Sequence, residues 1–101
     1  MGVSLKDRHY ISVTDFSSRE LEQVLNTARR VKKDPSDYAK SMRRKVLAMI
    51  FQKPSLRTRV SFESGMAQMG GHAIYLAPSD ISLGKRETTE DIALTISRMA
   101  D

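Results

Sequence analysis

A short segment after an apolar run concentrates groups that bind anions. Residues 51–59 read Phe-Gln-Lys-Pro-Ser-Leu-Arg-Thr-Arg, with two hydroxyls and two guanidinium groups between Ser55 and Arg59. Arg57 can bind two phosphate oxygens in a fork, and Ser55 and Thr58 can donate to the others. If a helix begins here, the unpaired backbone N–H groups of its first turn add a positive potential. Segment 51–59 therefore suits a small anion such as a phosphoryl group.

Simpler interpretations of the same residues remain open. Ser55 can serve only as a helix N-cap. Arg57 and Arg59 can be solvated, and Arg59 can pair with Glu63 one helical turn later. Residues 57–61 can also form a basic modification site in a flexible stretch, although the apolar run before them and the glycine pair after them favour an ordered one. Spacing alone leaves phosphate binding and helix capping evenly balanced.

The surrounding pattern predicts that segment 51–59 joins a strand to a helix. Residues 45–51 are mostly apolar, which is typical of a strand covered on both faces of a parallel sheet. Residues 55–69 show helical spacing and end at Gly70-Gly71, which suits a left-handed C-cap. Residues 72–76 predict a second short strand. Open α/β sheets bind ligands beyond the carboxyl ends of their strands, which is where segment 51–59 is expected.

The N-terminal part predicts one amphipathic helix after an irregular arm. Residues 1–13 show no sustained period, and we expect a short extended piece at residues 10–13. Ser17 then provides an N-cap, and Glu20 completes a capping box. Apolar side chains follow one helical face until Asp34-Pro35 ends the helix.

The C-terminal part predicts a polar loop at residues 79–87 and then a last helix. Thr88 can cap this helix, whose apolar face includes Ile92 and which we expect to reach Asp101. The order strand, helix, strand, helix predicts the α/β class, as a partial parallel-sheet domain whose core contains the methionines. Because two strands make a poor sheet, we expect the chain to be the first part of a larger domain.

Composition argues against several kinds of site. The 101 residues contain no cysteine, and His9 and His72 are far apart in sequence, so we expect no disulfide, thiolate nucleophile or protein-bound metal. The longest apolar run, residues 46–51, is too short for a bilayer helix, which predicts a soluble cytoplasmic protein. The net charge of +5 arises mainly from residues 29–45, which hold eight basic side chains, two acidic ones and a single aromatic, Tyr38. We interpret them as a solvated helix end rather than a nucleic-acid interface.

Segment 51–59 resembles a known family motif. Ser55-Leu56-Arg57-Thr58-Arg59 after an apolar strand is similar to the Ser-x-Arg-Thr-Arg carbamoyl phosphate motif of the aspartate/ornithine carbamoyltransferases. The likeness to the ornithine branch continues through residues 49–54, 60–63, 65–68, 70–73, 80–84 and 97–101. The resemblance implies a trimeric transferase that moves a carbamoyl group from carbamoyl phosphate to the δ-amine of ornithine. The products are citrulline and phosphate, and no metal or organic cofactor takes part.

The resemblance also implies roles for individual residues. Ser55, Arg57 and Thr58 hold the phosphate, together with the backbone N–H of Leu56, which stands where the family commonly has threonine. Arg57 and Thr58 are also the catalytic pair, because they face the carbonyl oxygen and stabilise the charge that develops there. Arg59 is assigned to structure.

The loop at residues 79–87 carries a second implication of the resemblance. In the family this loop reaches the neighbouring subunit's active site, so Ser82 and Lys85 are expected to contribute there, although Lys85 can equally be an exposed loop cation. The stretch 82–85 looks more like the aspartate branch, which keeps an aspartate carbamoyltransferase-type segment as an alternative. Another alternative is a non-catalytic anion-binding or assembly module. We expect residues 1–101 to be the N-terminal part of a carbamoyl phosphate-binding domain, without an acceptor-binding domain and without turnover alone.

Overall fold

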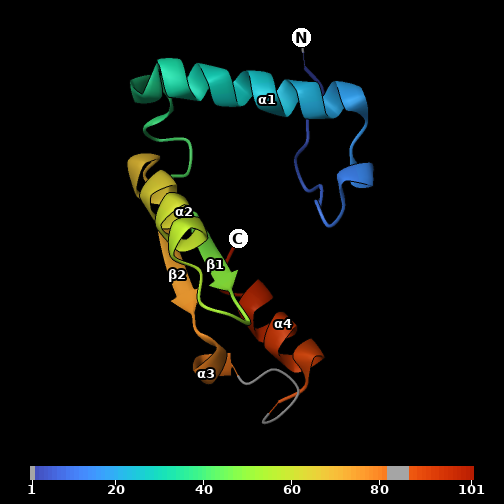
Figure 1. Cartoon of the computed structure of the whole chain (residues 1–101), viewed down its shortest axis with the longest axis vertical. Coiled ribbons are helices and arrows are strands. Elements are labelled where there is room, and N and C mark those ends of the chain that lie inside the picture. The colour runs from blue at the N-terminus through green and yellow to red at the C-terminus, as the bar shows by residue number, and fades with distance from the viewer. Residues whose placement is uncertain (1, 82–86) are drawn as a thin grey trace. The chain divides into compact units, whose positions relative to one another are not determined.

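The chain forms two compact units. The computed structural model describes residues 2–81 and 87–101. One unit is Met1–Tyr38, and the other is Ala39–Asp101. Figure 1 labels their helices and strands, coloured from blue at the N-terminus to red at the C-terminus. Segment 51–59 belongs to the second unit, which also contains both strands.

Helix α1, Ser18–Lys33, is the main element of the first unit, as predicted. The Ser17 hydroxyl accepts from the Glu20 N–H at 3.1 Å, and the Glu20 carboxylate accepts from the Ser17 N–H at 2.9 Å. The predicted capping box is therefore confirmed. The helix ends at Asp34, where a short 3-10 turn, η2 (Pro35–Tyr38), follows. Local side chains thus determine both ends of α1.

Arg8 ties the N-terminal arm to the first turn of α1. Its guanidinium binds the Glu20 carboxylate at 2.6 Å and donates to the Asp15 carbonyl at 2.9 Å. It also lies over the Phe16 ring, 4.9 Å from the ring centroid. The hydrogen bond from Arg8, and a second one from the Ser17 N–H, lower the pKa of Glu20 from 4.5 to about 2. Glu20 therefore stays ionised in the folded unit over nearly the whole acidic range.

The expectation of an extended piece at residues 10–13 is wrong. The Asp15 carboxylate accepts from the N–H of Ile11 at 2.7 Å and from the N–H of Ser12 at 2.9 Å. These bonds close a 3-10 turn, η1 (Val13–Asp15), capped by Ser12. The Asp15 carboxylate thus accepts from backbone N–H groups that, in an extended strand, would have bonded to a neighbouring strand.

Two parallel strands and the helix between them form the centre of the second unit. Strand β1, Val46–Ile50, pairs with β2, His72–Leu76, so that their first residues and their last residues lie opposite each other. Helix α2, Leu56–Gln68, joins the two strands and packs on β2 (Figure 1). The predicted element order and the α/β class are confirmed. Segment 51–59 consequently starts at the carboxyl end of β1.

A glycine pair fixes the end of α2. Gly70 has a φ of +83°, and its N–H donates to the Ala67 carbonyl at 3.2 Å. The Gly71 N–H donates to the Met66 carbonyl at 2.8 Å. These are the two hydrogen bonds of a Schellman motif, so the predicted left-handed C-cap is confirmed. A Cβ on Gly71 would come within 2.6 Å of Met66 Cε and 2.9 Å of the Met42 carbonyl oxygen, which leaves no room for a side chain.

The core of the second unit is small. Within the ranges that the structure describes, Met49 is 4% exposed and Ile92 is 8% exposed, and these two form the buried core. The expectation that the methionines lie in the core is confirmed for Met49 and wrong for Met99, whose side chain is 73% exposed. Strand β1 was expected to be covered on both faces, yet Ile50 is 43% exposed. The described residues therefore cover the strand pair only in part.

Helix α4, Thr89–Ser97, begins as predicted but ends earlier than predicted. The Thr88 hydroxyl accepts from the Asp91 N–H at 3.0 Å, which confirms the cap. The expected run to Asp101 is wrong, because the last residues leave the helix and reach β1. The Asp101 N–H donates to the Val46 carbonyl at 2.9 Å, and the Asp101 carboxylate accepts from the Val46 N–H at 3.0 Å.

The polar loop expected at residues 79–87 is wrong in its first part. A short helix, α3 (Pro78–Ile81), follows β2 almost directly. The Asp80 carboxylate accepts from the Ala77 N–H at 2.9 Å, and the Asp80 N–H donates to the Ala77 carbonyl at the same distance. This reciprocal pair of bonds closes one helical turn where the sequence suggested irregular chain.

We expect the stability of the first unit to fall in acid through Glu20. A carboxylate whose folded pKa is about 2 contributes stability that is complete above its unfolded value of 4.5 and is lost as the pH falls toward 2. Glu20→Gln removes this contribution at every pH. The unfolding free energies of parent and variant, measured by helical circular dichroism, should differ at about pH 6 and converge as the pH approaches about 2. A difference that stays constant across this range would contradict the assignment.

Gly70 and Gly65 should respond in opposite ways to alanine. Gly70→Ala places a side chain at a φ of +83° and should lower the unfolding free energy by about 1–2 kcal/mol. Gly65 lies inside α2 with nothing within 4 Å of the Cβ position, so Gly65→Ala should raise that free energy by up to about 1 kcal/mol. Urea unfolding measures both changes. Shifts of the same sign would refute the role given to the Gly70 backbone.

Candidate anion-binding site

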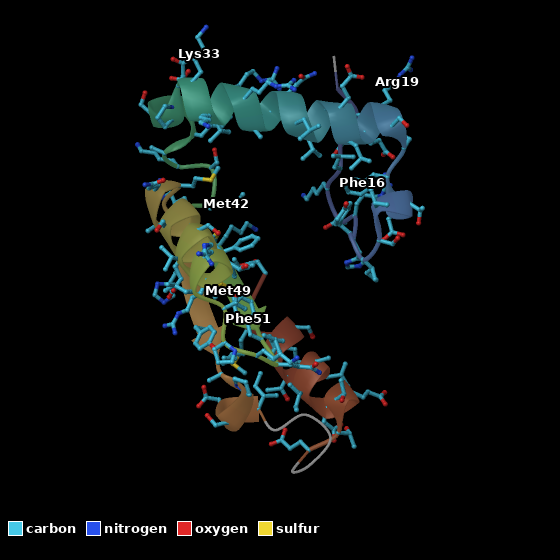
Figure 2. The ribbon with its side chains drawn as sticks, viewed as in Figure 1. Phe16, Arg19, Lys33, Met42, Met49 and Phe51 are labelled. Atoms are coloured by element: carbon cyan, nitrogen blue, oxygen red, sulfur yellow. The ribbon has the colours of Figure 1, made fainter. Side chains whose placement is uncertain are left out.

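Segment 51–59 leaves the carboxyl end of β1 and enters the first turn of α2. A hollow at this place is lined by residues from the strand, the turn and the helix: Ile50, Phe51, Gln52, Lys53, Ser55 and Thr58. Figure 2 labels Met49 and Phe51 among the side chains at this end of β1. Because α/β sheets hold ligands beyond the carboxyl ends of their strands, this hollow is the candidate site.

Ser55 occupies the N-cap position of α2 without capping the helix. Its backbone is extended, with a φ of −145° and a ψ of 107°, and its hydroxyl makes no cap hydrogen bond. The first helical bond runs from the Arg59 N–H to the Ser55 carbonyl at 3.2 Å. The N–H groups of Leu56, Arg57 and Thr58 precede that bond, so the helix supplies them no acceptor. The interpretation of Ser55 as a cap alone is therefore wrong, and its hydroxyl lies at the helix start beside these N–H groups without capping them.

The residues predicted to hold phosphate differ in where their side chains lie. Ser55 and Thr58 both line the hollow. Leu56 is 77% exposed, which limits its part to the backbone N–H. Arg57 is exposed and is not among the residues that line the hollow, so its guanidinium must reach a bound anion from outside. The hollow thus brings together two of the three predicted side chains, those of Ser55 and Thr58.

Lys53 is the cation that the structure adds to the hollow. It lies in the turn between β1 and α2 and lines the hollow with Ser55 and Thr58. The predicted anion donors begin at Ser55 and do not include Lys53. The position of Lys53 in the turn that follows β1 was the sequence feature that could have indicated it. An ammonium group here supplies a compact positive charge beside the two hydroxyls.

Arg59 lies on the first turn of α2 and makes two side-chain contacts away from the hollow. Its Nε donates to the Glu63 carboxylate at 2.9 Å, which confirms the predicted pair. Its guanidinium lies over the ring of Tyr75 on β2, with Cζ 3.9 Å from the ring centroid. Nothing in the sequence pattern indicated this second contact.

Other predicted features fall partly beyond the described ranges. Ser82 and Lys85, which were expected to reach a neighbouring subunit, lie outside the described residues. Within residues 2–81 and 87–101, no three side chains of metal-ligating types come together. No helix of those same ranges combines the length and apolarity needed to cross a membrane.

Comparison with known proteins relates the chain to carbamoyltransferases. Residues 8–101 match the carbamoyl-P binding domain of the aspartate/ornithine carbamoyltransferases. The ornithine carbamoyltransferase of Hydrogenovibrio crunogenus is 47% identical over 96 residues, which are 93% of this chain and 32% of that protein. The solved ornithine carbamoyltransferase of Pyrococcus furiosus is 43% identical, with a TM-score of 0.93 over 99% of this chain and 33% of its own.

An aspartate relative is similar to a smaller degree. The catalytic subunit of M. jannaschii aspartate transcarbamoylase is 34% identical, with a TM-score of 0.79 over 92% of this chain and 31% of its own. The chain thus spans about a third of the length of these relatives. Since the matching domain covers nearly all of the sequence, the predicted resemblance is confirmed, and this chain belongs to the aspartate/ornithine carbamoyltransferase family.

Proposed function

We propose that this chain supplies the phosphate-binding part of an enzyme that transfers a carbamoyl group from carbamoyl phosphate to ornithine. The products are citrulline and phosphate. One observation carries the proposal: Ser55 does not cap α2 with its hydroxyl and lines a hollow together with Lys53 and Thr58. The match of residues 8–101 to a carbamoyl-P binding domain supports carbamoyl phosphate as the anion.

A phosphoryl group at the start of α2 would meet four kinds of donor. The backbone N–H groups of the first turn and the hydroxyls of Ser55 and Thr58 donate neutral hydrogen bonds. Lys53 adds a point charge from the turn. The exposed guanidinium of Arg57 closes over the anion from outside and binds two of its oxygens in a fork. Together these donors fix the phosphate and leave the carbonyl carbon open to attack.

Arg57 and Thr58 are proposed to act on the transition state. Attack by an amine on the carbonyl carbon moves negative charge onto the carbonyl oxygen, where donors from these two residues stabilise it. When the bond from that carbon to the phosphate oxygen breaks, the charge of the departing phosphate grows. The donors at the start of α2 stabilise that charge as well. The part proposed for this chain is therefore electrostatic, and the proton that the amine loses ends on the departing phosphate.

Ornithine is the acceptor that the comparisons favour. The two ornithine relatives share 47% and 43% of their aligned residues with this chain, against 34% for the aspartate relative. We assign acceptor binding to the remaining length of such relatives, and residues 1–101 to the N-terminal part of the carbamoyl phosphate-binding domain. A trimer in which Ser82 and Lys85 reach a neighbouring subunit, and a cytoplasmic location, belong to the same proposal through the family resemblance.

Arg57→Ala tests the proposed phosphate site. Amide NMR of the 101-residue chain, titrated with inorganic phosphate and with carbamoyl phosphate, should show shifts at residues 52–59 that saturate. Loss of the charged, bidentate contact from Arg57 should weaken phosphate binding at least about tenfold. Arg98→Ala is a matched control, because Arg98 is an exposed arginine at the C-cap of α4 in the same unit. A parent chain without shifts at these residues would refute the site.

Ser55→Ala and Ser17→Ala should separate binding from capping. Ser17 caps α1 with a 3.1 Å hydrogen bond, so its alanine variant should lose about 1 kcal/mol of stability and keep phosphate binding. Ser55 makes no such bond, so Ser55→Ala should change stability by less than about 0.5 kcal/mol and weaken phosphate binding. Urea unfolding and the phosphate titration measure the two effects. A large stability loss with unchanged binding in Ser55→Ala would show that Ser55 is only a cap.

A further inference from the structure

Arg59 connects the start of α2 to β2. Its Nε donates to Glu63 at 2.9 Å, while its Cζ lies 3.9 Å from the Tyr75 ring centroid. A guanidinium in this place is attracted by the negative face of the ring. The backbone N–H of Arg59 also makes the first bond of the helix, to the Ser55 carbonyl at 3.2 Å. The backbone of Arg59 therefore closes the first helical bond, and its side chain contacts the sheet.

Tyr75 connects Arg59 to the wall of the hollow. Its ring packs edge-on against Phe51, with centroids 5.5 Å apart and 81° between the ring planes. Aromatic pairs favour this arrangement. Phe51 lines the hollow together with Ser55. A continuous set of contacts thus runs from Arg59 through Tyr75 to the hollow.

The turn between β1 and α2 is held mainly at its two ends. Its middle residues, Gln52 to Pro54, are all exposed, whereas Phe51 and Ser55 are half-buried. Arg59 acts on both of these anchors: through Tyr75 it contacts the side on which Phe51 lies, and through its N–H it binds Ser55. Loss of the Arg59 guanidinium would therefore loosen the turn at the Phe51 end, whereas the backbone bond to Ser55 would remain.

We propose that Arg59 is a positioning residue of the phosphate site, whose guanidinium fixes Phe51 through Tyr75 without touching the anion. The inference rests on the proposed function, since it concerns the same hollow. Donors that are already in place bind an anion more tightly, because less freedom is lost when the anion arrives. Lys53, between the two anchors, is the donor whose placement depends most on this arrangement.

A planar guanidinium is needed for the two side-chain contacts of Arg59. Its edge donates to Glu63 while its face stacks on Tyr75. A lysine ammonium keeps the charge but has no plane, so it can serve one partner at a time. Arg59→Lys therefore separates positioning from simple attraction between a positive charge and an anion.

Titration of the chain with inorganic phosphate, followed by amide NMR, tests the inference. We expect Arg59→Lys and Tyr75→Leu each to weaken phosphate binding about fivefold. The double variant should lose no more than either single variant, because both changes break the same contact. Tyr75→Phe keeps the ring and should bind phosphate as the parent does. Arg43→Lys, at an exposed arginine of the same unit, is the matched control and should also bind as the parent does.

Two results would overturn the positioning role. Unchanged affinity in Arg59→Lys would mean that charge alone explains the residue. Losses that add in the double variant would mean that Arg59 and Tyr75 act separately. If the peaks of Tyr75→Leu collapse because it does not fold, the contrast between Arg59→Lys and Tyr75→Phe decides: weaker binding only in Arg59→Lys supports the role, and equal binding refutes it.

Arg57→Ala distinguishes this inference from the proposed function. Phosphate binding that is lost in Arg57→Ala but unchanged in Arg59→Lys would leave the phosphate site in place and remove only the role of Arg59. A parent chain that binds no phosphate would remove both.

Discussion

The parallel pairing of β1 with β2 is the constraint on which the rest of the second unit depends. Parallel neighbours require a crossover, and α2 provides it. Because both strands run the same way, the helix must begin beyond the end of β1 and finish at the start of β2. The unpaired N–H groups of its first turn are thereby placed at the carboxyl edge of the sheet, together with Ser55 and Thr58. The location of the candidate hollow follows from this topology.

Contacts between near neighbours were predictable, and contacts between distant residues were not. The capping box at Ser17 and the glycine end of α2 each depend on residues within about one helical turn, so a short stretch of sequence contains the whole cause. Arg59 meets Tyr75 only because β2 returns beside β1. The Asp101 carboxylate accepts from the N–H of Val46, 55 residues away in sequence. This contact is possible because α4 ends at Ser97, earlier than its sequence pattern suggested.

The candidate site was predictable as a place and only partly as a set of side chains. The order of elements puts segment 51–59 at a strand end whatever the packing. Which residues line the hollow depends on how the turn and the first helical turn are placed: Lys53 lines it, whereas Leu56 and Arg57 do not. In sequence Ser55 resembles Ser17, since each precedes a helix. Only the backbone angles and the missing cap hydrogen bond distinguish Ser55, a candidate anion-binding residue, from Ser17, a helix cap.

Helix α2 is held at both ends, and this restricts how the segment can vary in evolution. Its start is tied to β1 by a short turn, and its end is tied to β2 by Gly70 and Gly71, where added atoms find no space. One inserted or deleted residue would rotate the following part of the helix by about 100°. Either Arg59 would then lose its contact with Tyr75, or Gly70 and Gly71 would no longer stand at the C-cap of α2. Length is therefore constrained more strictly than composition between residues 46 and 76, so relatives should differ there by substitution, with insertions and deletions confined to the flanking loops.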